Sequence, residues 1–240
     1  MQVQDDELAK GGGFTLSRMF KFVRRTWNPV VGCTHNCTYS CWARRMAKRQ
    51  KHRCQLCYEF IPHLHEERLN VFVPRRPTLC FVCDMGDLFC DGVRDEWIER
   101  VLDVARRCRN VTFLFLTKNP ARYFDFLDLF PKNSILGCTI ETNRSYAVSL
   151  APPVGERYIA MRDLKWPRKF IAVEPILDFD WVFLDWLKKI KPIMVSVGYN
   201  NYTKRFPEPD VEKTLTLIKE LKKFTNVEIK TIRGGNSSGD

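Results

Sequence analysis

Residues 112–116 read Thr-Phe-Leu-Phe-Leu, and Thr117, Lys118 and Asn119 follow them directly. A short run that is apolar at nearly every position is typical of a strand buried on both faces, as in a parallel sheet. The polar residues that follow mark the end of such a strand. Further short runs of β-branched or aromatic residues share this character and lie at 20–26, 79–83, 135–140, 170–173, 193–197 and 227–229.

The segments between these runs are typical of helices. Residues 94–107, 121–130 and 210–224 carry apolar side chains at helical spacing, and Pro120 and Pro209 stand where helices tolerate proline, at the start. A strand-then-helix order repeated about six times predicts right-handed parallel crossovers. We therefore expect an α/β fold with a parallel (β/α) partial or full TIM-like barrel, and an open doubly wound sheet is the alternative. In both, function is expected at the carboxyl ends of the strands.

Polar residues follow most of the predicted strands, and they become candidates for a site. The alternative for each of them is a purely structural role, in which a side chain at the end of a strand stabilises the loop that follows. They are Asp84-Met85-Gly86-Asp87 after residues 79–83, Thr117-Lys118-Asn119 after 112–116, Glu141-Thr142-Asn143 after 135–140, Glu174-Pro175 after 170–173, and Gly198-Tyr199-Asn200 after 193–197.

The loop after the first predicted strand carries Cys33, Cys37 and Cys41. Three thiols on one loop can bind three irons of a 4Fe–4S cluster and leave the fourth iron open to a small ligand. A structural zinc ion would need a fourth protein ligand, which His35 or a distant cysteine could supply. The spacing favours the cluster and leaves zinc as the alternative.

Six motifs occur in order along the chain, at residues 27–46, 60–70, 81–89, 115–120, 136–142 and 172–175. Together they resemble one known family, the phage Gp37/Gp68-like (DUF5131) family, which is related to radical S-adenosylmethionine (SAM) enzymes. The resemblance covers most of residues 27–198. It implies a barrel of the radical SAM type, a 4Fe–4S cluster on the three cysteines, and cleavage of SAM to a 5′-deoxyadenosyl radical, with an electron donor such as ferredoxin or flavodoxin.

The resemblance also implies roles for individual residues. Asp84, Met85 and Gly86 would meet the amino end of SAM. Glu141 and Asn143 would hold the ribose hydroxyls, and Gly198 the adenine side. Glu174 and Lys118 are the candidates for catalytic or substrate contacts. The sequence departs from the wider superfamily in having three residues, not two, between Cys37 and Cys41, and in having no Gly-Gly-Glu after the second strand.

The remaining cysteines suggest a second metal site. Cys54 and Cys57 are spaced to chelate, and we expect them to join Cys90, and perhaps Cys83, around zinc or an iron–sulfur centre. His63 and His65 are weaker candidates, and reduced, unligated thiols are the alternative. Cys80 is excluded because residues three apart on a strand face opposite sides, and Cys108 and Cys138 are expected in the core.

The charge distribution favours an anionic partner. The net charge is +11, and the stretch from Arg18 to Arg53 holds ten Lys or Arg residues and no Asp or Glu. A basic stretch of this kind is typical of DNA or RNA binding, although it also suits a solvated helix face. The leading hypothesis is therefore a radical SAM enzyme that modifies a nucleic acid or nucleotide. The alternatives are a radical SAM enzyme acting on a peptide or metabolite, and a non-catalytic zinc-dependent nucleic-acid-binding module.

Length and composition predict one domain. The 240 residues, 45% of them hydrophobic, suffice for a single α/β barrel over 14–233, with a cysteine-rich insertion around 42–78. Polar residues 1–13 are expected to be disordered, and 234–240 to form a flexible tail. No run of about 18 apolar residues and no signal-peptide pattern is present, so we expect a cytoplasmic protein without membrane contact.

Overall fold

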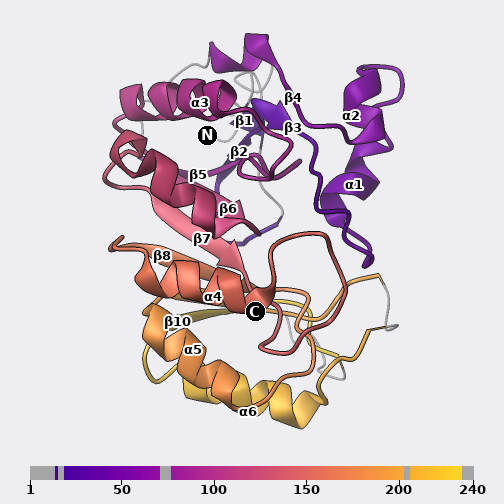
Figure 1. The fold of residues 1–240 in the computed structure, drawn as a ribbon, viewed down its shortest axis with the longest axis vertical. Helices are drawn as coiled ribbons and strands as arrows, with labels where there is room; N and C mark the ends of the chain where they lie inside the picture. Colours follow the sequence, from indigo (N-terminus) through magenta and orange to yellow (C-terminus); the bar gives the residue numbers. More distant parts are fainter. Residues whose placement is uncertain (1–13, 16–18, 71–76, 203–205, 234–240) are drawn as a thin grey trace, which may run out of the picture.

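A computed structural model describes residues 14–15, 19–70, 77–202 and 206–233, so the predicted disordered start and flexible tail lie outside the described residues. The described chain forms one strongly curved sheet with helices on its convex face (Figure 1). The strands of this sheet, in spatial order, are β1 (Phe14–Thr15), β2 (Arg25–Trp27), β5 (Thr78–Val82), β6 (Val111–Thr117), β7 (Ile135–Thr139), β8 (Lys169–Val173), β9 (Met194–Val197) and β10 (Asn226–Ile229).

The strands from β2 to β10 are all parallel to their neighbours, and β1 is antiparallel to β2. Phe81 pairs with Leu114, and Phe115 with Leu136, along the centre of the sheet. Every residue of β7 and β8 is buried, as expected for strands covered on both faces. The prediction of a parallel α/β partial barrel is confirmed, and the sheet has the form of a half-barrel.

Helices cover the outer face of the half-barrel and make the larger core. Phe113 and Phe115 point outward from β6 and pack in one cluster with Phe89, Tyr123 and Phe130. Residues 121–130, predicted as an α-helix, form a 3₁₀ helix instead. Two of the covering helices, at Val154–Asp163 and Val182–Ile190, were not predicted. The outer elements are α3 (Asp95–Arg107), η3 (Pro120–Leu129), α4 (Val154–Asp163), α5 (Val182–Ile190) and α6 (Val211–Leu221).

A second, smaller core fills the concave face. Phe20 packs there against Phe81 and Phe170, with ring centroids 5.7 and 5.2 Å apart. The backbone N–H of Lys21 donates to Glu228 at 2.7 Å, so the N-terminal segment bridges the gap between the first and last strands of the sheet. The strand predicted at 20–26 is therefore too long: β2 begins at Arg25, because Phe20 lies in a turn that enters the barrel interior.

The cysteine-rich insertion lies between β2 and β5 in the chain, and Figure 1 shows it near the end of the sheet that holds β1 and β2, far from α5 and α6. The strand predicted at 79–83 follows the insertion as β5 and ends one residue early, at Val82, because Cys83 has a left-handed backbone with φ of 59°. No helix of the described residues has the length and apolarity that a membrane crossing requires. The elements of the insertion are β3 (Val30–Val31), α1 (Trp42–Ala47), α2 (Gln55–Glu59), β4 (His63–Leu64) and η2 (Glu66–Leu69), and β3 pairs antiparallel with β4.

Candidate functional site

A cavity of about 370 Å³ opens at the carboxyl ends of the strands. This volume lies within the range of pockets that bind small molecules. Its floor comes from concave-face side chains such as Phe81 and Leu116, and its rim from the loops that follow the strands. The residues predicted to bind the cluster, SAM or substrate that line it are Cys33, Cys37, Cys41, Asp84, Gly86, Lys118 and Glu174. Other strand-end candidates that line it are Asp87, Thr117, Pro175, Tyr199 and Asn200.

Two glycines fix the start of the cysteine loop. Gly32 has φ of 99°, and a Cβ atom there would overlap the backbone of Ile61. A Cβ atom on Gly86 would overlap the carbonyl oxygen of Gly32. Gly32 donates its N–H to the Met85 carbonyl at 3.1 Å, and Asp87 donates its N–H to the Gly32 carbonyl at 3.2 Å. Only glycine allows the backbones to approach so closely, so Cys33 begins at a fixed position beside the end of β5.

A buried His–Asp pair holds the next part of the loop. His35 Nε2 lies 2.8 Å from Asp87 Oδ2, and both side chains are buried. Asp87 also accepts the backbone N–H groups of Phe89 at 3.0 Å and Lys118 at 2.9 Å. Burial alone would raise the pKa of Asp87, but the hydrogen bonds, first that from His35, lower it overall. The loop is thus attached to an anion that remains charged.

The far part of the loop is attached to the segment after β7. Tyr39 donates its hydroxyl to Glu141 Oε1 at 3.1 Å. Thr38 donates its N–H to the Val148 carbonyl at 2.8 Å, and Leu150 donates its N–H to the His35 carbonyl at 2.7 Å. The cysteine loop therefore crosses the mouth of the half-barrel, from the end of β5 to the segment after β7.

The three thiols of the loop are half-buried and line the same cavity. They are not gathered around one point, since they do not belong to any group of three donor atoms within 4.8 Å of one another in the described chain. Burial raises the pKa of Cys41. Cys90, which does not line the cavity, hydrogen-bonds with Cys33, and this contact together with burial raises the pKa of Cys33. As the acceptor in this bond, Cys90 has its pKa lowered to about 6.

The residues after β5 lie beside the thiols. Met85 packs in one cluster with Cys33, Cys41 and Phe60. Asp84 accepts a hydrogen bond from Asn28 at 2.6 Å, and burial, only partly offset by this bond, raises its pKa to about 6. With this pKa the Asp84 carboxyl group gains or loses its proton close to neutral pH.

Glu141 is fully buried below the rim, and its oxygens are occupied by protein partners. It forms ion pairs with Lys118 and, at 2.8 Å, with Arg157, and it accepts the hydroxyl of Tyr39. Burial alone would raise the pKa of Glu141, but the two cations lower it to about 2. Glu141 does not line the cavity. Its carboxylate positions Lys118 and Tyr39, which do.

Asn143 and Gly198 are also set back from the cavity wall. Asn143 accepts the backbone N–H of Asp180 at 2.9 Å. Gly198 packs so tightly that a Cβ atom would lie 2.9 Å from the side chain of Lys230. Of the residues expected to face the adenosine part of SAM, the structure therefore brings none directly to the wall, and instead brings neighbours such as Tyr199.

Residues that follow the last three strands, β8, β9 and β10, complete the rim. Glu174 pairs with Lys230 at 3.1 Å, and burial raises the pKa of Glu174 although Lys230 opposes it. Asn201 and Tyr202, after β9, also line the cavity. Sequence reasoning did not single out Lys230, Asn201 or Tyr202. Lys230 could have been found, because it is the first residue after the last predicted strand.

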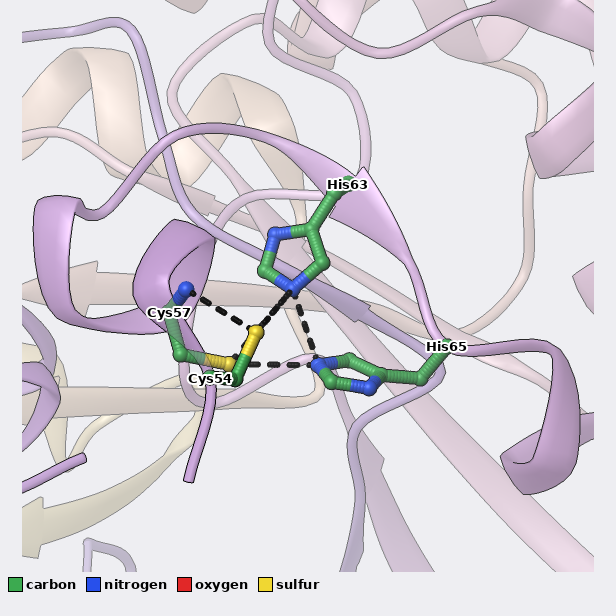
Figure 2. Close-up of side chains that lie close together, drawn as sticks. All are labelled: Cys54, Cys57, His63 and His65. Carbon is green, nitrogen blue, oxygen red and sulfur yellow. Dashed lines mark hydrogen bonds between the residues drawn. The ribbon is translucent and has the colours of Figure 1, made fainter. Parts of the chain in front are cut away.

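A second cysteine cluster lies in the insertion, and its membership differs from the sequence prediction. Cys54 and Cys57 meet His63 and His65, with all four donor atoms within 4.8 Å of one another (Figure 2). Cys90, which was expected to join Cys54 and Cys57, lies beside Cys33 instead, and the two histidines named as weaker candidates take part. Cys83 is buried at the end of β5, where its N–H donates to the carbonyl of Trp27 at 2.8 Å.

Basic side chains lie beside the mouth of the cavity. α1 follows Cys41 directly, and Arg45 on this helix stacks over the ring of Tyr202, 4.3 Å from its centroid. Lys48 and Arg49 are exposed just beyond, as are Lys51 and Arg53. Arg18 lies outside the described residues. The exposed cations thus continue outward from a cavity-lining aromatic residue.

Two solved structures of spore photoproduct lyase share this fold. One, a mutant with bound AdoMet and dinucleoside spore photoproduct, has a TM-score of 0.60 and 11% identity over 90% of this chain and 78% of that chain. Another, complexed with dinucleoside spore photoproduct, has a TM-score of 0.60 and 12% identity over 92% and 79%. At such identity the likeness establishes the half-barrel fold. No curated protein sequence matches this chain.

One family model, described as "Protein of unknown function (DUF5131)", matches residues 18–197. The match begins before β2 and ends with β9, so it contains the cysteine loop, the second cysteine cluster and most of the cavity wall. Because it spans 180 of the 240 residues, the chain belongs to the DUF5131 family.

Proposed function

We propose that this protein is a radical SAM enzyme that binds a 4Fe–4S cluster through Cys33, Cys37 and Cys41. One observation carries the proposal: three thiols from a single loop line one cavity at the carboxyl ends of a half-barrel. The structural neighbour with bound AdoMet supports it, because that protein binds the proposed cofactor on the same fold.

The donor set fits a cluster better than a single ion. Donors around one zinc ion lie about 3.8 Å apart when both are sulfur, whereas three cysteines that each bind a different iron must be farther apart. The three thiols are not gathered within 4.8 Å. The backbone N–H of His35 donates to Cys33 Sγ at 3.4 Å, and this bond partly offsets the effects of Cys90 and burial, which raise the pKa of Cys33. Cys90 contacts Cys33 but is not among the residues that line the cavity, so it does not take up the space that a further ligand would need there.

A 4Fe–4S cluster held by Cys33, Cys37 and Cys41 would supply the electron for reductive cleavage of SAM, and with it the radical chemistry that removes hydrogen from a substrate. Asp84, Met85 and Gly86 would contact the amino end of SAM, since they lie beside Cys33 and Cys41.

Glu141 acts on the site through two other residues. It holds Lys118 and Tyr39 on the cavity wall, and these two meet the bound ligands. Asn143 and Gly198 brace the loops on the adenosine side. Glu174, with Lys230, faces the substrate.

The substrate is proposed to be a nucleic acid or nucleotide. The exposed cations of α1 and the turn after it begin at Arg45, whose partner Tyr202 lines the cavity. A phosphate backbone that lies on these cations would bring a base to the aromatic rim. The neighbour's ligand, a dinucleoside, supports this substrate class. The electron donor is of the ferredoxin or flavodoxin kind, and residues 14–233 act as a single domain.

Anaerobic purification with iron and sulfide reconstitution tests the chemistry. We expect about four irons with matching sulfide per chain, and 5′-deoxyadenosine when SAM and dithionite are added. Cys37→Ala should lose both signals. The matched control, Cys108→Ala, changes a buried cysteine at the end of α3, outside the cavity lining, and should keep both. A folded Cys37→Ala protein that retains the iron, or a loaded protein that never yields 5′-deoxyadenosine, would refute the proposal.

Binding measurements separate the substrate classes. Affinity for DNA or RNA should fall steeply as salt rises, because phosphate contacts release counterions. Stimulation of 5′-deoxyadenosine formation by oligonucleotides, and not by a peptide library, is the expected result. Stimulation by peptides alone would place the substrate in the other class.

A further inference from the structure

We propose that Cys54, Cys57, His63 and His65 bind one zinc ion in a closed structural site. Cys57 lies in α2 and Cys54 directly before it, while His63 lies in β4 and His65 directly after it. None of the four lines the cavity. The zinc site therefore shares no ligand with the cluster proposed on Cys33, Cys37 and Cys41, and the two proposals can be tested independently.

The separations of the four donors match a tetrahedral ion. With Zn–S near 2.3 Å and Zn–N near 2.0–2.1 Å, tetrahedral geometry places sulfur and nitrogen about 3.5 Å apart and two nitrogens about 3.3 Å apart. His63 Nε2 lies 3.5 Å from Cys54 Sγ and 3.5 Å from Cys57 Sγ. His65 Nε2 lies 3.1 Å from Cys57 Sγ and 2.9 Å from His63 Nε2. Figure 2 shows both imidazoles directing these nitrogens toward the sulfurs.

The opposite nitrogen of each ring decides the tautomer. His63 Nδ1 lies 2.8 Å from the carbonyl oxygen of Ile61, and this oxygen can only accept, so Nδ1 must carry the proton. His65 Nδ1 lies 3.1 Å from Oε1 of Glu67, which fixes that ring in the same way. Both Nε2 atoms then direct lone pairs into the same space, only 2.9 Å apart. Two such acceptors repel each other unless a cation lies between them, and oxygen partners on the outer nitrogen are typical of metal-bound histidine.

The chemistry of the donors selects zinc. Two thiolates and two imidazoles in a tetrahedral arrangement suit zinc, and together they neutralise its charge. Cys57 donates its backbone N–H to Cys54 Sγ at 3.5 Å, which stabilises that sulfur as a thiolate. Four protein ligands leave no open position, so the site is structural.

The location of the site indicates what it stabilises. His63 pairs in the small sheet with Val31, and Val31 lies two residues before Cys33. The carbonyl of Phe60 accepts the N–H of Cys33 at 3.2 Å, and Gly32 packs directly on Ile61. Residues 60–65 are therefore the surface on which the cysteine loop begins. A zinc ion that joins α2 to β4 holds this surface in place.

Metal analysis of the full chain, purified without added chelator, tests the proposal. We expect one zinc per chain. Cys57→Ser and His65→Gln should lose it, whereas the matched controls Cys108→Ser and His52→Gln should keep it, because Cys108 ends α3 and His52 is exposed outside the cluster. Cobalt substituted for zinc should give the intense visible absorption of a tetrahedral ion and a thiolate charge-transfer band.

Two further measurements keep the result interpretable. If Cys57→Ser does not fold, thiol modification of the unaltered protein should release zinc to a chromophoric chelator. A Cys33→Ala, Cys37→Ala, Cys41→Ala triple variant should lose iron and keep zinc, so failure of the cluster proposal leaves the zinc result readable. A folded chain without zinc, zinc retained equally in all variants, or iron lost in place of zinc from Cys57→Ser would each overturn the inference.

Discussion

Replacement of the buried carboxylate by its amide, Glu141→Gln, should destabilise the protein strongly at neutral pH. The amide keeps the shape and can still accept the Tyr39 hydroxyl, but it leaves Lys118 and Arg157 without their counterion. The pKa of Glu141 is lowered from 4.5 to about 2, and each pKa unit corresponds to about 1.4 kcal/mol. The carboxylate therefore contributes about 3 kcal/mol to the free energy of unfolding, and removing one partner of a buried ion pair costs about 3–5 kcal/mol by an independent route.

The pH dependence gives a sharper test. Because the pKa is lower in the folded than in the unfolded state, the contribution of Glu141 is complete above about pH 5 and is lost as pH falls from about 4.5 toward 2. The difference in unfolding free energy between the unaltered protein and Glu141→Gln should fall from about 3 kcal/mol at neutral pH to about 2 kcal/mol at about pH 3.5.

Urea unfolding followed by circular dichroism measures this difference. The matched control is Glu96→Gln on α3, whose side chain is exposed and 4.0 Å from Arg94; it should change stability by less than about 0.5 kcal/mol. A cost below about 1 kcal/mol for Glu141→Gln, or a cost that stays constant down to about pH 3.5, would refute the reasoning that the ion pairs outweigh desolvation.

Three further perturbations test other parts of the structure. Gly32→Ala places a Cβ atom on the backbone of Ile61 at φ of 99°, so it should lower the unfolding free energy by more than about 2 kcal/mol in a thermal or urea assay. The control Gly155→Ala in α4, where a Cβ atom would have nothing within 4 Å, should be neutral or stabilising, and equal effects of the two changes would show that the contact with Ile61 does not matter. Phe20→Ala should lower the free energy of unfolding by about 3–5 kcal/mol because it opens a cavity inside the half-barrel, whereas Leu150→Ala, at a side chain 75% exposed, should lower it by less than about 0.5 kcal/mol. A small effect of Phe20→Ala would show that the interior packing is not needed for stability. The triple change of Lys48, Arg49 and Lys51 to Gln should reduce the slope of log binding constant against log salt concentration for DNA by about 0.9 per lost phosphate contact. The same change at Lys188, Lys189 and Lys219, on α5 and α6, should leave the slope as it is, and an unchanged slope for the first variant would show that the nucleic acid binds elsewhere.

The strands of the sheet could be predicted from sequence because they are buried on both faces. Runs such as residues 112–116 and 170–173 are apolar at nearly every position, and the structure places them in β6 and β8. The helix α4 was missed because it has no apolar stripe: its buried positions include Arg157, whose charge is matched by Glu141 across the fold. A sequence window around α4 contains no sign of that partner.

The site was predicted unevenly for a similar reason. Polar residues directly after strands, such as Asp84 and Lys118, do reach the cavity, since the carboxyl ends of parallel strands meet at one edge. The same rule overreached for Glu141, which is turned into the protein by Lys118 and Arg157. Which residues join Cys54 depends on the pairing of β3 with β4, a tertiary contact that spacing along the chain does not encode.

The contact between the two ends of the sheet has a consequence for the order of folding. From β5 to β10 each parallel pair joins strands that are neighbours in the chain, and only the insertion separates β2 from β5, so the sheet can grow one strand at a time during synthesis. Lys21, however, bonds to Glu228, 207 residues away, and Lys230 bonds to the carbonyl of Met19. Phe20 can meet Phe81 and Phe170 earlier, but the two bonds that hold its segment across the gap need β10, and closing so long a loop is slow. We therefore expect the interior to be sealed last, after the outer helices have docked.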